Sequence, residues 1–421
     1  MAPWRATLRG DERNEMQARA PLHPGITSRK LKSAVFVLEG LNSLGTTYFF
    51  YYLYFYTREQ FKFGTLQNLC MAAGFGFLYA FGALLGGRFA QKFGYYTAIQ
   101  LGVSLMMISF FSCAFAGSWG LIVTLAALGN AGMCFTWPAV EALVSEGELP
   151  TRLPSLVGFY NFIWAITAAF AYFTGGEMMD RWGRRTIFFL PAAIMAVELL
   201  IIIWVEFAAR RQTAPDPEVI RPLLHAEPEG YKSSVSPKTF LRMAWVANPM
   251  AYIAINTVIP TIPSIAKRLD FSPAMAGFVC SLWLFTRTAT FVGLRLWTGW
   301  HYRFSYLTAA YVAMIISFAG LLLAPNQWVL IPSEALFGVT LGLIYYSSLF
   351  YSMDVGDTKG EHGGLHEAAI GFGNGMGPAI AALALTVFPG FRGSGTCAVC
   401  VILLIGLLAL FRIRFASGQG N

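Results

Sequence analysis

The sequence is poor in charge for its length. Of its 421 residues, 12% are charged and 56% are hydrophobic, against about 25% and 45–50% in soluble globular domains. Aromatic residues, at 15%, outnumber the charged ones. A soluble chain of this size could not hide so much apolar surface behind so few charges. This balance excludes a cytoplasmic enzyme, a nucleic-acid-binding domain and a disordered chain, and it predicts a polytopic membrane protein.

Motifs of soluble-type catalysis are lacking as well. The chain contains no HExxH, no GxSxG and no GxxxxGK[ST] phosphate loop. The missing phosphate loop argues against an ATP-driven pump, so we expect energy to come from an ion gradient or from the solute's own gradient. The five histidines show no metal-ligand spacing. We therefore predict no metal site, no cofactor and no enzymatic activity.

Two absences bear on secretion. No cleavable signal peptide is expected, and cysteine is scarce. The first 33 residues are polar, hold seven Lys/Arg and contain no apolar core, which argues against a cleavable signal peptide. All six cysteines fall in apolar stretches, which predicts free buried thiols and no disulfide framework. They are Cys70, Cys113, Cys134, Cys280, Cys397 and Cys400.

Long apolar runs are what the chain does have. A membrane-spanning helix needs roughly 20 apolar residues, and twelve such runs can be placed. They lie at about 34–56, 69–89, 96–115, 120–143, 156–177, 186–208, 243–265, 273–295, 305–324, 328–353, 364–388 and 395–415.

A single long polar segment divides these runs six from six. It covers about residues 209–241, is rich in proline and charge, and is typical of a linker. We therefore predict a basic N-terminal tail (1–33), a six-helix bundle (34–208), the linker (209–241), a second six-helix bundle (242–415) and a short C-terminal tail (416–421).

The distribution of Lys and Arg predicts the orientation. The tails, the linker and the loops on their side hold 21 of these residues, and the loops on the other side hold 8. Cytoplasmic loops carry the excess of positive charge in membrane proteins. We therefore expect a multi-pass protein of the inner or plasma membrane with both termini in the cytoplasm. The exceptions to the bias are Arg181, Arg184 and Arg185.

The two halves of the sequence resemble each other weakly. A shift of 206 residues aligns Gly158–Asn161 with Gly364–Glu367, each after a polar loop rich in proline or glycine. A shift of 208 residues aligns Tyr79 with Arg287. Together with the central linker, these matches favour two parallel six-helix repeats.

Three loop and helix motifs resemble those of the major facilitator superfamily. The turn after the second span, Gly87–Gly94, is similar to the GxLADRxGRR signature, with Gln91 at the aspartate position and a basic Lys92. The turn after the fifth span, Gly175–Arg185, fits that signature better, through Asp180, Arg181 and Gly183. In the eleventh span, Gly371–Pro378 resembles a glycine–proline motif that exporters of the family carry in span 5, where this chain has none.

The resemblance covers about residues 34–415 and implies a fold and a mechanism. The fold is an all-α membrane protein of twelve transmembrane helices in two pseudo-symmetric six-helix bundles around a central cavity. Helices 1, 4, 7 and 10 would line the cavity, helices 2, 5, 8 and 11 would flank it, and the remaining four would face lipid. The bundles would rock to expose the cavity to alternate sides of the membrane.

One arginine lies too deep in a span to reach water easily. Arg287 is fifteen residues into its span, about 22 Å along a helix, and an ionisable group at that depth costs roughly 2.5–3.5 kcal/mol. Because arginine stays charged, it needs an anion. We predict a cavity-facing clamp for a carboxylate or phosphate; the alternative is a structural pair with a buried glutamate.

Five glutamates are further candidates. A carboxyl group that alternates between wet and dry surroundings can bind and release a proton, which is the physical basis of proton coupling. The candidates for coupling are Glu39, Glu141, Glu334 and Glu367. Glu39 and Glu141 are favoured among the four, and the alternative for both is an interhelical hydrogen bond near the cytoplasmic gate. Glu198 lies on a helix expected to face lipid, so a structural role between helices is favoured there.

Uncharged polar side chains inside the spans need partners, which neighbouring helices or a polar solute can supply. The run Tyr48–Tyr56 is interpreted as an interfacial aromatic belt in preference to a ligand cage. The further candidates for the solute site, beside Arg287, are Asn42, Asn161, Trp164, Asn256, Tyr346 and Asn374.

These features predict a secondary transporter that moves a small organic anion by alternating access, coupled to protons or another ion. The aromatic richness keeps open a drug-type proton antiporter. From another class, the chain could be a transporter-like receptor or scaffold whose tail and linker bind partners or anionic lipids. The expected partners are the solute, the coupling ion and the lipid bilayer; no nucleic acid is expected, and the protein is expected to be a monomer.

Overall fold

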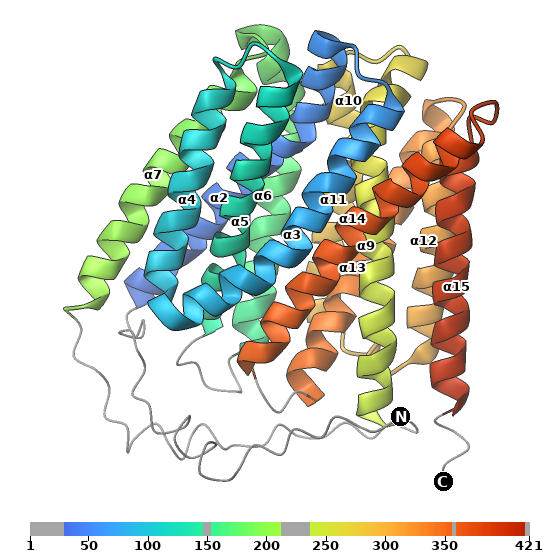
Figure 1. The fold of residues 1–421 in the computed structure, drawn as a ribbon. Helices are drawn as coiled ribbons and strands as arrows, with labels where there is room; N and C mark the ends of the chain where they lie inside the picture. Colours follow the sequence, from blue (N-terminus) through green and yellow to red (C-terminus); the bar gives the residue numbers. More distant parts are fainter. Residues whose placement is uncertain (1–28, 146–152, 212–235, 356–358, 417–421) are drawn as a thin grey trace, which may run out of the picture.

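A computed structural model describes residues 29–145, 153–211, 236–355 and 359–416. Most of the predicted N-terminal tail, linker and C-terminal tail lies outside these residues. The described residues form thirteen helices and no strand. The helices run side by side between two ends (Figure 1). We call the end where α2 begins and α15 finishes the terminal end, and the opposite one the far end.

The first bundle contains six helices in chain order: α2 (Arg29–Phe61), α3 (Thr65–Phe93), α4 (Tyr95–Cys113), α5 (Trp119–Ser145), α6 (Leu153–Trp182) and α7 (Thr186–Ala209). The second bundle contains α9 (Pro237–Arg268), α10 (Pro273–Cys280), α11 (Leu282–Leu296), α12 (Phe304–Leu323), α13 (Gln327–Val355), α14 (Lys359–Val387) and α15 (Ser394–Ala416).

The twelve predicted spans are all helical, with one break. The eighth is divided at Ser281 into α10 and α11, which together are long enough to cross a membrane. Eleven helices of the described chain are sufficiently long and apolar to do so. The remaining span, α2, is the first in the chain. It is as long as the others, but its buried tyrosines and Asn42 make it more polar. The predicted all-helical fold of two six-helix bundles is therefore confirmed.

Large apolar side chains are exposed on the outer helices. Leu200 on α7 is 69% exposed, Ile316 on α12 is 62% exposed and Leu408 on α15 is 63% exposed. A soluble protein rarely shows so much apolar surface, whereas a membrane protein turns it toward lipid. Two of the predicted buried thiols, Cys70 and Cys397, are exposed in the same way, and all six cysteines are free.

Glycine brings the two bundles close together along two helix pairs. Helix α3 runs beside α14 (Figure 1), and a Cβ on Gly76 would lie 2.2 Å from the backbone nitrogen of Gly375. Helix α6 meets α10, where a Cβ on Gly176 would lie 2.1 Å from the carbonyl oxygen of Pro273. Small residues allow this approach in a membrane, where lipid gives helices no hydrophobic reason to associate.

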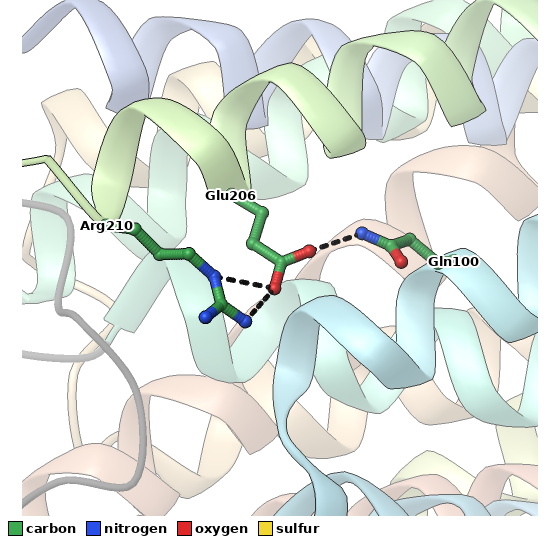
Figure 2. A network of polar contacts seen from close by, with 3 residues as sticks. All are labelled: Gln100, Glu206 and Arg210. Atoms are coloured by element: carbon green, nitrogen blue, oxygen red, sulfur yellow. Dashed lines mark hydrogen bonds and ion pairs between the residues drawn. The ribbon is translucent and has the colours of Figure 1, made fainter.

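A surface network fastens α4 to α7 at the terminal end. Glu206 accepts a hydrogen bond from the Gln100 amide nitrogen at 2.6 Å and a bond from the Arg210 Nη2 at 2.6 Å (Figure 2). The Arg210 side chain is 67% exposed, and such i,i+4 pairs contribute only about 0.3–0.5 kcal/mol. The network therefore orients the last turn of α7 more than it stabilises the bundle.

The aromatic run Tyr48–Tyr56 is not an interfacial belt. Most of its side chains are buried inside the first bundle, because α2 is surrounded by α5, α6, α7 and α9. Tyr52 donates a hydrogen bond to the Tyr172 carbonyl oxygen at 2.5 Å. Phe50, Tyr51 and Tyr54 from the run line the internal cavity described next.

Candidate functional site

A cavity of about 230 Å³ lies between the two bundles. Its lining comes from α2, α3, α5 and α6 of the first bundle and from α9, α11, α13 and α14 of the second. Within the described residues, α4, α7, α12 and α15 contribute nothing to it. These are the third, sixth, ninth and twelfth spans, which are the outer helices that the family resemblance implies. The second, fifth, eighth and eleventh spans, expected only to flank the cavity, also contribute to its lining.

Arg287 lies in the wall of this cavity, where aromatic rings surround it. Its side chain is 3% exposed. The guanidinium carbon is 4.8 Å from the ring centroid of Trp164, 4.9 Å from that of Tyr345 and 5.6 Å from that of Phe291. The ring of Tyr252 completes the set at 6.0 Å. All four distances fall in the range of cation–π attraction.

The rings satisfy the guanidinium only in part as a hydrogen-bond donor, because the Tyr252 hydroxyl is the ring group that interacts with it in this way. No acid among the described residues lies within ion-pairing distance of Arg287, and its Nε–H has no acceptor there. A cation–π contact contributes about 0.5–2 kcal/mol, and burying a charge costs several kcal/mol. The predicted alternative, a structural pair with a buried glutamate, is absent from the described chain. The Arg287 guanidinium, which forms part of the cavity wall, therefore has an N–H donor without a protein acceptor among the described residues.

Two carboxyl groups line another part of the cavity wall. Glu141 on α5 and Glu367 on α14 both contribute to the lining and act on each other electrostatically. The Tyr79 hydroxyl of α3 donates a hydrogen bond to Glu367 Oε2 at 2.7 Å. This bond joins α3 of the first bundle to α14 of the second. Glu141 also belongs to the cavity lining.

Amide groups supply the other polar part of the lining. The Asn256 amide nitrogen donates a hydrogen bond to the Asn374 oxygen at 2.5 Å, which links α9 to α14 within the second bundle. The Asn130 amide nitrogen donates to the Phe75 carbonyl oxygen at 2.7 Å. Each amide retains atoms that can bond a polar solute.

Hydrogen bonds between the bundles close the far end. Ser264 on α9 accepts from Arg58 Nη1 at 2.8 Å and bonds the Thr65 hydroxyl at 2.7 Å. The Asn68 amide nitrogen approaches the Pro260 carbonyl oxygen at 3.5 Å. The structure therefore holds the cavity shut on the side away from the termini.

The two turns singled out by their motifs share one backbone design. Gly94 and Gly183 each end a helix with positive φ, at 104° and 89°, a conformation that favours glycine. Asp180 accepts a hydrogen bond from the backbone N–H of Ala274 at 3.3 Å, at the N-terminus of α10, where a negative charge is favourable. Gln91 forms no side-chain hydrogen bond to the described residues.

The basic residues that broke the charge bias are largely paired. Arg184 Nε lies 2.8 Å from Glu59 Oε2, which joins the turn after α6 to the end of α2. Arg181 pairs with Glu177 within α6. Lys92, at the corresponding place in the other turn, lies over the Phe93 ring at 5.1 Å. The contacts of the turn after α6 therefore form at the far end, where Arg184 links it to α2 and Asp180 links α6 to α10.

Among the predicted site residues, the structure brings Arg287, Trp164, Asn256, Asn374, Glu141 and Glu367 to the cavity. The others lie elsewhere. The Asn161 amide is taken up by its own helix, donating to the Val157 carbonyl at 2.9 Å and accepting from Trp164 at 2.9 Å. Tyr346 packs against Trp300 and Phe291 behind the wall.

Three further predicted residues are buried away from the cavity lining. Glu334 is fully buried beside Cys280. Glu39 and Asn42 are fully buried within the first bundle. Sequence reasoning missed the lining residues Tyr51, Asn130, Tyr160 and Tyr252, because nothing in their local sequence separates them from tyrosines and amides that pack between helices.

Comparison with known proteins identifies the family. The profile of the Major Facilitator Superfamily matches residues 35–366. The chain belongs to the major facilitator superfamily. A curated relative, the uncharacterized MFS-type transporter YvkA of Bacillus subtilis (strain 168), is 24% identical over 133 residues. That match covers 31% of this chain and 30% of the relative.

Solved structures of three transporters share the fold. The peptide transporter POT, as a mutant in complex with sulfate, has a TM-score of 0.70 at 16% identity, over 96% of this chain and 99% of that one. The nucleoside transporter NupG has a TM-score of 0.66 at 14% identity, over 91% and 99%. The human organic anion transporter MFSD10 has a TM-score of 0.64 at 14% identity, over 91% and 100%.

The match to the family profile makes the protein a membrane transporter of this superfamily. The described residues hold no group of three or more His, Cys, Asp or Glu side chains placed to bind a metal ion. The cavity can offer a solute one cation, two carboxyl groups, amides and aromatic rings.

Proposed function

We propose that this secondary transporter carries a small organic anion and that Arg287 binds the anionic group. The observation that supports this most strongly is a buried guanidinium in the cavity wall with no carboxylate partner among the described residues. Arginine matches carboxylate and phosphate through paired N–H donors. The surrounding rings of Trp164 and Tyr345 would hold the apolar part of such a solute.

We also propose that transport is coupled to protons through the carboxyl groups of the cavity. Glu141 and Glu367 repel each other when both are charged, so a proton bound to one of them relieves the repulsion. A solute anion arriving with a proton would add no net negative charge to the closed cavity. This proposal orients the protein with both termini in the cytoplasm, as the excess of Lys and Arg on that side favours.

A drug-type exporter is the second candidate, because aromatic rings line the cavity. Four of them lie within 6.0 Å of the Arg287 guanidinium. An exporter of bulky cations would have to place its substrate beside that positive charge, which is electrostatically unfavourable. The anion is therefore the better fit to the same cavity.

Exchange in liposomes holding only this protein tests the proposal. The panel consists of labelled acetate, benzoate, succinate and glycerol 3-phosphate, with tetraphenylphosphonium as the cation. After subtraction of the leak measured in protein-free liposomes, which acetic acid, benzoic acid and tetraphenylphosphonium cross unaided, we expect exchange of at least one anion and none of the cation. Arg287→Gln should slow that exchange at least thirty-fold, since a lost charged hydrogen bond costs about 2 kcal/mol.

The matched control is Arg412→Gln, which removes an exposed arginine on an outer helix. We expect it to leave exchange within twofold of the unmodified protein. Exchange of tetraphenylphosphonium that survives Arg287→Gln would instead support the exporter. Absence of any exchange would contradict both transport proposals.

A further inference from the structure

Two glutamates in the first bundle are buried together outside the solute cavity. Glu39 on α2 and Glu198 on α7 are both 0% exposed. None of their four carboxyl oxygens forms a well-placed hydrogen bond to the described residues, and Tyr160 is the side chain that interacts with Glu39 as a hydrogen-bonding group. Neither side chain lines the cavity, so they are not accounted for by solute binding.

The packing of α2 against α7 brings these groups to one level. The helices run antiparallel (Figure 1), and a Cβ on Gly45 would lie 2.7 Å from the Met195 methyl carbon. Asn42 lies three residues before Gly45 on α2, and Glu198 lies three residues after Met195 on α7, so the two are at the same height in this antiparallel pair. Glu39 lies about one helical turn further along α2. The carboxyl groups of Glu39 and Glu198 act on each other electrostatically.

The amide of Asn42 belongs to the same cluster. It is 0% exposed, and neither its nitrogen nor its oxygen has a hydrogen-bond partner in the described chain. A buried polar group left without a partner costs about 1–3 kcal/mol. Three such side chains at one helix crossing are not explained by packing, and they indicate a site that takes up a small polar or charged ligand.

The charge balance of the cluster identifies that ligand as a cation. The charged group that acts on Glu198 is Glu39, and α4, which also packs against α7, contains no charged residue. The groups that face Glu39 are Tyr160 of α6, Glu141 of α5 and Glu367 of α14, besides Glu198. Two unpaired carboxylates buried at one place would each cost several kcal/mol.

Tyr160 stands between the buried cluster and the cavity. Its hydroxyl faces Glu39, and it interacts with Glu141 as well. Tyr160 and Glu141 both line the cavity, whereas Glu39 does not. A tyrosine hydroxyl is both donor and acceptor, so it can accept the proton of Glu39 while it donates its own toward Glu141.

We propose that Glu39 and Glu198 form a proton-binding site between α2 and α7, outside the solute cavity, and that Tyr160 connects this site to Glu141. The proposal rests on the proposed proton-coupled transport and names where the coupling proton is held. One proton bound by either carboxyl group of the pair removes a buried negative charge, and the amide of Asn42 is available to bond the remaining carboxylate. The solute site at Arg287 and the proton site are then separate.

Infrared difference spectroscopy of the purified protein tests the site without any solute. A protonated carboxyl group has a C=O stretching band that an ionised one lacks. We expect the Glu39–Glu198 pair to contribute one component of this band in the unmodified protein at neutral pH. That component should shift or disappear in Glu198→Gln and in Glu39→Gln, while the components of the other buried glutamates, such as Glu334, remain. The matched control is Glu206→Gln, on the same helix as Glu198 but in the surface network of Figure 2, which should keep the band.

Transport in liposomes tests the coupling. The probe is the anion of the panel that the unmodified protein exchanges. With Glu198→Gln we expect exchange within twofold of the unmodified protein, and a fall of accumulation driven by a pH gradient to the level of protein-free liposomes under the same gradient. Tyr160→Phe should keep the infrared band and slow the accumulation at least tenfold. Glu206→Gln should change neither measurement.

Each of several results would overturn the proposal. One is an infrared band that is unchanged in both Glu198→Gln and Glu39→Gln. Another is full pH-driven accumulation in a correctly folded Glu198→Gln, which would assign the pair a structural role. A third is accumulation driven by sodium and not by pH. Failure of all panel anions to exchange would count against the proposed function, and the infrared result would still decide on the proton site.

Discussion

The Tyr79 hydroxyl and the Glu367 carboxyl group, 2.7 Å apart, form a hydrogen bond that joins the two bundles at the wall of the cavity. Tyr79 aligns with Arg287 when the halves of the sequence are superposed, and both side chains line the cavity. The two repeats thus place a hydroxyl on one side and a guanidinium on the other at matching positions. The two halves therefore place side chains at equivalent positions in the cavity wall, but one of these side chains is a neutral hydroxyl and the other is a cation.

Removal of the Tyr79 hydroxyl should weaken the contact between the bundles. Tyr79→Phe leaves Glu367 without this donor, and the loss of a buried bond to a carboxyl group costs about 1–3 kcal/mol. We expect the melting temperature to fall by a few degrees. Tyr306→Phe removes a hydroxyl from the outer helix α12, which does not line the cavity, and should leave the melting temperature unchanged. Equal melting temperatures of all three proteins would show that the bond contributes nothing.

The contact between Asp180 and the start of α10 should favour the state in which the far end is closed. Asp180→Asn removes the negative charge from a helix N-terminus, an interaction of about 0.3–1 kcal/mol. We expect the two bundles to separate at that end in a larger fraction of molecules. Spin labels on cysteines that replace Trp182 and Lys267 report this as a larger share of long distances.

Asp270→Asn is the matched control for that measurement. Asp270 lies at the same end of the molecule, at the end of α9, and its φ of 57° is one that asparagine accepts. It should leave the distance distribution as it is. If Asp180→Asn also leaves it unchanged, the turn after α6 does not hold the far end closed.

The close approach of α3 and α14 should not tolerate a side chain at Gly76. A methyl group there would lie 2.2 Å from the Gly375 nitrogen, so Gly76→Ala must push the bundles apart. We expect loss of most transport and a lower melting temperature. Gly74→Ala, two residues away on the same helix, meets nothing within 4 Å and should be neutral or slightly stabilising, because alanine favours a helix over glycine by about 1 kcal/mol. Similar behaviour of both variants would contradict the described interface.

Much of the fold follows from the sequence, because apolar length decides where a chain crosses a membrane. All twelve spans were predictable in this way. The break between α10 and α11 was not, since Ser281 has no proline or glycine beside it. The buried position of the run Tyr48–Tyr56 was also missed, because tyrosine at a membrane interface and tyrosine between polar-lined helices give the same sequence pattern.

The cavity was predictable only in part. Asn161 and Trp164 are three residues apart on α6, yet only Trp164 lines the cavity. Which face of a helix turns inward depends on how the bundles pack, and several helices here have polar groups on more than one face. Arg287 could be identified because a charge at mid-membrane is costly enough to need a reason. The sequence favours a structural role for Glu198 because its helix is expected to face lipid. Its interaction with Glu39 depends on the register of α2 and α7, which the sequence does not give.

The most direct test of the central claim is a comparison of a carboxylate with its neutral amide. The affinities for benzoate and benzamide, or for the panel anion that exchanges best and its amide, are measured calorimetrically with the unmodified protein and with Arg287→Gln. The account predicts a preference for the carboxylate of at least thirty-fold in the unmodified protein, about 2 kcal/mol, and its disappearance in Arg287→Gln. A carboxylate preference that persists in a folded Arg287→Gln protein would contradict the assignment of Arg287 as the anion-binding residue.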